Sequence, residues 1–148
     1  MIAVRKATAL DVSGAFEIET EVTPNPWKER YFQAELENPL SFFYVAEEDS
    51  FGGIVGFIVF WLIDEQMELH NIAVSGAAQR KGVANALMNL MMNIASECEV
   101  REIFLEVRAS NQAAISLYEK FGFISVGVRK NYYSRPGEDA RLYKYSFI

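Results

Sequence analysis

The 148-residue sequence contains one cysteine, Cys98, and one histidine, His70. A single cysteine cannot form an internal disulfide, and no Cys-x-x-Cys pair is present to hold a structural metal or to act as a redox pair. Because 51% of the residues are hydrophobic, the chain can bury a core without such supports. We therefore expect a protein that needs no metal and works in a reducing compartment, the cytoplasm.

Long apolar runs and an excess of positive charge are also missing. The most apolar stretch, residues 51–63, is well short of the roughly 20 residues that a membrane helix needs, and the first residues lack the charged-then-apolar order of a signal peptide. Fourteen Lys and Arg against twenty Asp and Glu give a formal net charge of -6, the wrong sign for binding phosphate backbones. We expect neither a membrane nor a nucleic acid as a partner, and a cationic partner such as a basic peptide suits the charge better.

Turn residues and apolar periodicities predict one domain, residues 1–148, of the α/β class with a mixed sheet. Asp11 and Asn25 are the expected caps of the first two helices, with Pro26 opening the second helix and Trp27 inside it. The remaining predicted elements are strands 2–7, 41–47, 54–63, 67–74, 102–107, 123–133 and 140–147, a long helix 79–98, and a helix from Asn111 to Gly122. The order is β-α-α-β-β-β-α-β-α-β-β, with an antiparallel meander over 41–74 and a last turn containing Pro136.

The segment that precedes the long amphipathic pattern, residues 79–84, reads Gln-Arg-Lys-Gly-Val-Ala. A turn into a helix directs unpaired backbone N–H groups at one point, and the helix dipole adds positive potential there, so an anion can bind. Gly82 leaves the backbone accessible, and Arg80 and Lys81 add charge. The motif alone fits a basic surface turn that begins an amphipathic helix equally well, so the choice between the two depends on the rest of the sequence.

Three parts of the sequence resemble the GNAT superfamily of N-acetyltransferases. The segment 79–84 resembles the family's Q/R-x-x-G-x-G/A signature, which holds the coenzyme A pyrophosphate, and residues 105–123 resemble the second half of the GNAT fold. The segment 127–133 (GVRKNYY), with 138–140 (EDA), 71–74 (NIAV) and 26–27 (PW), is similar to the ribosomal-protein-alanine acetyltransferase branch. The resemblance implies the GNAT fold and acetyl-CoA as co-substrate.

The same resemblance implies roles for individual residues. Glu106 matches the family's general base and Tyr118 its general acid. The implied coenzyme contacts are Ile72, Ala73, Val74, Gln79, Arg80, Lys81, Gly82, Val83, Ala84 and Asn111, and the implied walls of the acceptor cleft are Trp27, Asn131, Tyr132 and Tyr133.

Elementary geometry supports the two catalytic assignments. Alternation on a strand places Glu106 away from the more apolar face, and the helical position of Tyr118 turns it toward the sheet. Taken alone, such a Glu is more often a solvated carboxylate paired with Arg108 or a lysine, and a tyrosine such as Tyr118 is more often a core aromatic. Tyr132 and Tyr133 alone would be ordinary strand aromatics. Asn111 can serve as a helix cap as well as a ligand.

Other residues compete for the catalytic roles. Strict alternation places Glu68 and His70 on the same face as Ile72 and Val74, so either side chain is an alternative base. Cys98 falls at a core-like helical position, which predicts a buried thiol and not a nucleophile.

The function that we expect is direct transfer of an acetyl group from acetyl-CoA to the N-terminal α-amine of a protein, an alanine of a ribosomal protein. A backbone N–H near residues 72–74 would stabilise the oxyanion. The alternatives are a GNAT enzyme that acts on a small amine, such as a polyamine, an antibiotic or an amino acid, and a coenzyme A-binding regulator without turnover. The sequence leaves the oligomeric state open.

Overall fold

The computed structural model describes residues 1–134 and 137–147. Its strands are β1 (Ile2–Lys6), β2 (Ser41–Glu48), β3 (Ile54–Ile63), β4 (Gln66–Val74), β5 (Glu102–Arg108), β6 (Ile124–Ser134) and β7 (Gly137–Ser146). Its helices are α1 (Val12–Val22), α2 (Glu29–Glu37), α3 (Val83–Glu97) and α4 (Gln112–Lys120), with short 3-10 turns at Ala9–Asp11 and Gly76–Ala78. The predicted order of elements is confirmed.

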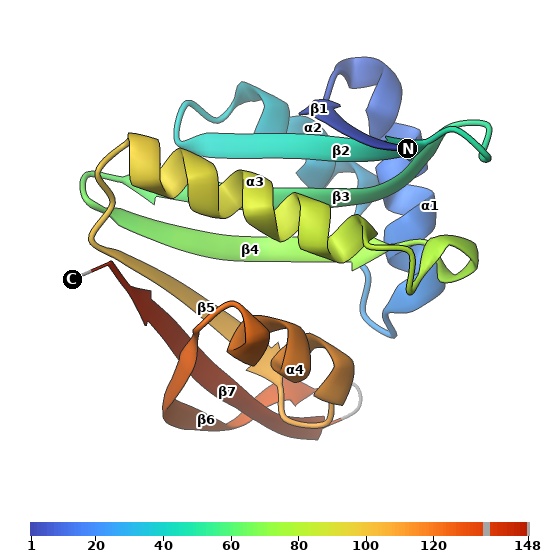
Figure 1. Ribbon diagram of the computed structural model, residues 1–148. Helices are drawn as coiled ribbons and strands as arrows, with labels where there is room; N and C mark the ends of the chain where they lie inside the picture. Colours follow the sequence, from blue (N-terminus) through green and yellow to red (C-terminus); the bar gives the residue numbers. More distant parts are fainter. Residues whose placement is uncertain (135–136, 148) are drawn as a thin grey trace.

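All seven strands form one mixed sheet in the order β1-β2-β3-β4-β5-β7-β6. Strands β1 to β4 pair antiparallel, as predicted for the meander, and β5, β7 and β6 form a second antiparallel group. The two groups are joined by β4 and β5, which run parallel and therefore need a crossover, supplied by α3. Figure 1 shows β4 and β5 separating as they leave this short contact.

Helices cover both faces of the sheet. The larger core lies under α3 and α4, where Met88 and Met91 are fully buried. The smaller core lies under α1 and α2, where Phe32 is fully buried and its ring meets that of Phe57 edge to face at 5.1 Å. In Figure 1, α3 lies on one side of the meander and α1 on the other.

A β-bulge in β4 changes the face to which its side chains point. Val59 of β3 is opposite Asn71, but the next residue, Phe60, is opposite Leu69, so His70 is the extra residue. A bulge of this kind reverses the alternation of the side chains beyond it. Asn71 therefore faces α1 and α2.

The bulge makes one prediction wrong. Glu68 is paired with Trp61, whose indole N–H donates to Glu35 of α2, and the His70 ring lies 4.2 Å from the Trp61 ring. Ile72 packs instead against the core under α3. Glu68 and His70 are thus on the opposite face from Ile72, because strict alternation does not hold through the bulge.

Two helices begin later than predicted. Helix α2 starts at Glu29 and not at Pro26, because the Trp27 N–H donates to the Glu19 carboxylate at 3.0 Å and holds this segment outside the helix. Helix α3 starts at Val83 and not at Gln79, because Gly82 has φ 86°, which a helix does not allow.

Cys98 was also predicted incorrectly. It lies just after α3, where the chain turns, and its thiol is exposed and not buried. Pro136 of the predicted last turn lies outside the described residues. No helix in the described part of the chain is both long and apolar enough to cross a membrane.

Asp11 stands at the first position before α1, as predicted, but its side chain does not cap that helix. Its Oδ2 accepts hydrogen bonds from the Thr8 backbone N–H and from Arg5 Nη1, each at 2.8 Å, and its Oδ1 accepts from Arg5 Nη2 at 2.9 Å. The carboxylate therefore joins β1 to the start of α1.

This contact predicts a pH-dependent contribution to stability. The Arg5 guanidinium holds the pKa of Asp11 below its usual value, so the stabilisation is complete above the unfolded pKa of about 3.9 and is lost as the pH falls through the folded pKa. Urea unfolding from pH 7 to pH 3 should find Asp11→Asn less stable than the wild type at pH 7, with the difference shrinking in acid. Asp64→Asn, at an exposed turn, is the control. A constant difference across this range would contradict the assignment.

Candidate active site

Beyond Leu69 and Leu105, β4 and β5 are no longer paired, and two clefts meet where they separate. The first, which we call the α1-side cleft, encloses about 720 Å³ between α1, the α1–α2 connection, β4, β5 and β6. The second, the α3-side cleft, encloses about 570 Å³ between the end of β4, the start of α3 and α4. Ile72, Asn111 and Tyr118 line both clefts. A molecule in one cleft can therefore reach a molecule in the other.

The loop 79–84 borders the α3-side cleft. The side-chain amide of Gln79 donates a hydrogen bond to the Val74 carbonyl at 3.2 Å. Arg80 and Gly82 both have left-handed backbone conformations, with φ values of 64° and 86°. In the described part of the chain, no hydrogen bond is donated by the backbone N–H groups of 80–85. These N–H groups and the dipole of α3 create a site for an anion.

Most of the predicted coenzyme contacts are brought together in this cleft. Its lining includes Ile72, Ala73, Val74, Gln79, Arg80, Gly82, Val83, Ala84 and Asn111. Lys81 is in the same loop but is exposed and does not line the cleft. The Asn111 side chain accepts the Ala114 N–H at 3.1 Å, which confirms its prediction as a helix cap.

Tyr118 is buried at the junction of the two clefts and is only 6% exposed. Desolvation raises the pKa of its phenol well above its usual value, so the group stays protonated at neutral pH. Ser41 Oγ is the one fully buried side-chain N or O atom without a partner in the described residues. The Tyr118 hydroxyl also has no hydrogen-bond partner among these residues, and since it is not a fully buried atom it keeps contact with the clefts that Tyr118 lines. It is able to donate a proton there.

Glu106 lies on β5 at the α1-side cleft, and the β6–β7 hairpin covers it. Its Oε1 is 3.5 Å from Arg129 Nη1, and the Glu106 carboxylate beside the Tyr132 phenol raises the pKa of Tyr132. Arg108, the expected partner of a simple surface carboxylate here, pairs instead with Glu138 at 3.2 Å. Glu106 is thus held by groups from a different strand.

A second bulge explains how β6 reaches Glu106. Arg129 is opposite Ala140 and Tyr133 is opposite Glu138, so β6 contains two more residues than β7 in this interval. Asn131 has φ 53°, and its N–H donates to Asp139 Oδ1 at 2.8 Å. The extra residues direct Tyr132 toward the cleft.

The other predicted acceptor contacts are arranged around the same opening. Trp27, Tyr132 and Tyr133 line the α1-side cleft, and the two tyrosine rings meet edge to face at 5.1 Å. Burial raises the pKa of Tyr133, whose ring lies 4.2 Å from the Arg108 guanidinium. Asn131 does not line the cleft and shapes the bulge through its backbone.

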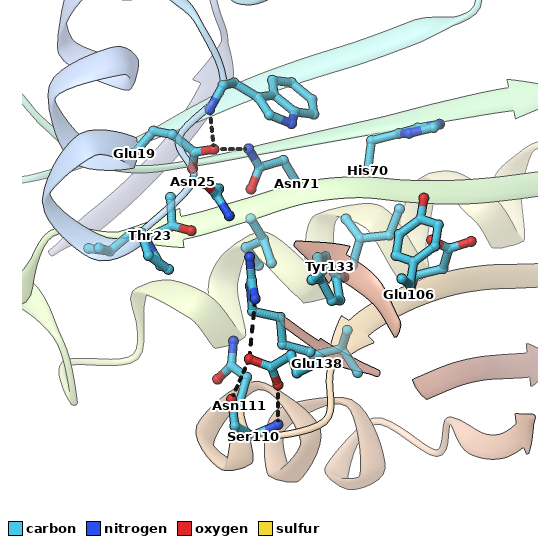
Figure 2. A pocket seen from close by; sticks show the side chains of 18 of the residues that line it. Glu19, Thr23, Asn25, His70, Asn71, Glu106, Ser110, Asn111, Tyr133 and Glu138 are labelled. Atoms are coloured by element: carbon cyan, nitrogen blue, oxygen red, sulfur yellow. Dashed lines mark hydrogen bonds and ion pairs between the residues drawn. The ribbon is translucent and has the colours of Figure 1, made fainter. Parts of the chain in front are cut away.

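Sequence reasoning missed Glu19 and Asn71. Glu19 is 4% exposed and lines the α1-side cleft, and its Oε2 accepts hydrogen bonds from the Trp27 N–H and from Asn71 Nδ2, both at 3.0 Å (Figure 2). A signal for Glu19 was present, because it follows Val12, Ala15 and Phe16 at the spacing of the apolar face of α1. Asn71 gave no signal, because the bulge decides its direction.

The alternative bases form a pair near the cleft. His70 Nε2 lies 3.1 Å from Glu68 Oε1, and His70 lines the α1-side cleft. Within the described residues, no group of three or more His, Cys, Asp or Glu side chains is arranged to hold a metal ion.

Comparison with known proteins gives the family. The model of the acetyltransferase (GNAT) family matches residues 12–123. The chain belongs to the GNAT acetyltransferase family. The fold predicted from the resemblance is therefore confirmed, and the loop 79–84 occupies the place of the GNAT signature between β4 and α3.

Two curated relatives and one solved structure resemble this GNAT chain over most of its length. The Escherichia coli (strain K12) protein named ribosomal protein bS18-alanine N-acetyltransferase is 34% identical over 131 residues, which cover 88% of this chain and 85% of that protein. The N-alpha-acetyltransferase of Sulfurisphaera tokodaii is 34% identical over 152 residues, covering 94% and 89%. The crystal structure of the Escherichia coli ribosomal-protein-S18-alanine N-acetyltransferase has a TM-score of 0.90 at 30% identity, covering 99% and 94%.

The anion site at the start of α3 can be tested by one pair of variants. Gly82→Asp adds a negative charge where we expect the pyrophosphate of acetyl-CoA and should nearly abolish binding, whereas Gly82→Asn has the same size and also tolerates positive φ. Titration calorimetry with acetyl-CoA should therefore separate the two variants strongly. Unchanged affinity in folded Gly82→Asp would remove the phosphate assignment.

Proposed function

We propose that this GNAT enzyme transfers the acetyl group of acetyl-CoA to the N-terminal α-amine of a protein, with the N-terminal alanine of a ribosomal protein as its acceptor. The observation that carries the proposal is the meeting of the two clefts at Tyr118, one bordered by an anion-binding helix start and the other by acidic and aromatic side chains. The names of the relatives at 34% identity support the α-amine as acceptor.

Acetyl-CoA is the donor that fits the α3-side cleft. Its pyrophosphate would accept hydrogen bonds from the free N–H groups of 80–85, and its pantetheine arm would follow the end of β4, whose edge β5 leaves open. A backbone N–H between Ile72 and Val74 would then stabilise the oxyanion of the thioester.

In the proposed reaction, the neutral amine attacks the thioester carbonyl carbon. A C–N bond forms, the C–S bond breaks, and the coenzyme leaves as a thiolate that takes the proton of Tyr118. Glu106 receives the proton that the amine loses, directly or through one water. Arg129 and the Tyr132 hydroxyl would orient the Glu106 carboxylate for this step.

An α-amine is an easier acceptor than a lysine side chain for a carboxylate base. The reference pKa is about 7.7–8.0 for an α-amine and about 10.4 for lysine, a difference of roughly 3.5 kcal/mol in forming the neutral nucleophile. The aromatic side chains of Trp27, Tyr132 and Tyr133 border a slot in which a small first residue such as alanine would fit.

The acceptor assignment predicts where the acetyl group is found. Peptides that differ in their first residue, each with an internal lysine, should be acetylated mainly at the α-amine, and fastest when alanine is first. Fragmentation mass spectrometry locates the added group. Modification mainly on lysine, or consumption of a polyamine with no peptide modified, would reject the assignment in favour of another amine.

The catalytic assignment predicts a second result. Glu106→Gln and Tyr118→Phe should each lower kcat by roughly 10²–10⁴-fold while the protein stays folded, because each removes one proton-transfer group. Cys98→Ala is the control and should stay active, because the exposed thiol lies outside both clefts. Near-normal turnover in Glu106→Gln with a crippled His70→Ala would move the base to β4.

A further inference from the structure

Glu19 is a buried carboxylate to which the proposed mechanism gives no task. It is 4% exposed, and both of its hydrogen bonds come from uncharged donors, the Trp27 N–H and the Asn71 amide. No Lys, Arg or His side chain of residues 1–134 or 137–147 forms an ion pair with it. A buried charge without a counter-charge is unfavourable in a folded protein.

One oxygen of this carboxylate is directed at the α1-side cleft. Both hydrogen bonds end on Oε2, and Oε1 has no partner among the described residues. Oε1 is nevertheless not a fully buried atom, because Ser41 Oγ is the one fully buried side-chain N or O atom of the described residues that has no partner. Oε1 must therefore retain accessible surface, and the cleft that Glu19 lines provides it (Figure 2).

The neighbouring contacts hold Oε1 in place. Glu19 is anchored to the connection between α1 and α2 through Trp27, and to the bulge of β4 through Asn71. Both anchors are walls of the cleft. The carboxylate is therefore a rigid, half-satisfied acceptor of the kind that binds a cationic donor with a charge-assisted hydrogen bond.

We propose that Glu19 is an acceptor-binding residue, whose free oxygen accepts a hydrogen bond from the protonated primary amine of the incoming substrate. The inference rests on the proposed function, because it takes the amine substrate to enter through the α1-side cleft. At neutral pH an α-amine with its reference pKa of about 7.7–8.0 is mostly an ammonium, so it supplies the cation that no described side chain provides to Glu19. Glu19 forms no covalent bond and keeps its charge. The ammonium first loses one proton to solvent water and becomes the neutral nucleophile, and the proton that the amine loses on forming the C–N bond goes to Glu106.

The test is Glu19→Gln. The glutamine oxygen can still accept from the Trp27 N–H and from the Asn71 amide, but the group facing the cleft becomes an NH₂ that cannot accept from an ammonium. The matched control is Glu17→Gln, which removes the same charge from an exposed position of the same helix.

In steady-state kinetics with an alanine-first peptide, Glu19→Gln should raise the acceptor KM by roughly 10- to 100-fold, the loss of one charged hydrogen bond. The KM for acetyl-CoA and kcat should stay near the wild-type values, and Glu17→Gln should change none of the three. The Tm of Glu19→Gln should equal or exceed that of the wild type, because burial opposes the charge of Glu19 and raises its pKa.

Calorimetry in the presence of coenzyme A gives a readout that does not depend on turnover. The wild type should bind the alanine-first peptide more tightly than the same peptide with propionyl in place of alanyl, which lacks only the amine. Glu19→Gln should bind the two peptides about equally.

Three results would overturn the inference: an unchanged acceptor KM, a fall in kcat alone, or a lower Tm in Glu19→Gln that marks the carboxylate as a structural link. If the wild type acetylates no peptide α-amine, the proposed function fails by itself. Glu19→Gln and Glu17→Gln are then assayed with the amine that the wild type consumes. An equal KM for that amine in the two variants rejects the role of Glu19.

Discussion

The site depends on the short pairing of β4 with β5. The parallel ladder joins Gln66–Leu69 to Glu102–Leu105 and then ends, while β4 stays paired with β3 and β5 with β7. Each strand therefore keeps its backbone hydrogen bonds along one edge and leaves its other edge open. The sheet divides in this way without leaving its buried backbone N–H and C=O groups unpaired. Because parallel strands need a crossover helix, α3 begins close to the end of β4. One constraint of topology thus brings an open strand edge, a helix N-terminus and two clefts to the same place.

Bulges then decide which side chains face this opening. The extra residue in β4, His70, turns Asn71 toward α1, where it meets Glu19. The extra residues in β6 carry Tyr132 onto Glu106. In both strands a local irregularity reverses or redirects the side chains, as bulges near functional sites commonly do. Glu19 of α1 and Glu106 of β5 are each contacted by a side chain from another strand, Asn71 of β4 and Arg129 of β6.

Burial favours the uncharged forms of both Tyr118 and Glu19. This suits the proposed function of Tyr118 and opposes that of Glu19. Desolvation keeps Tyr118 protonated, which is the form that a proton donor needs. The same effect opposes the charge on Glu19, so an ionised Glu19 is a source of instability until a cation binds. Proteins retain such unfavourable groups mainly where activity requires them, which accounts for an acidic residue on the otherwise apolar face of α1.

The sequence by itself determined the order of the elements, the meander, the position of the loop 79–84 and the identity of Glu106 and Tyr118 as the pair to examine, because periodicity and short motifs are local properties of the chain. It could not determine the start of α2 or the exposure of Cys98, where contacts and turns outweigh local preference. It also could not determine which way the side chains of β4 point, because a bulge depends on pairing with β3. Glu19 became a candidate only in the folded protein, since the lack of a counter-charge among the described residues depends on every element packed around it.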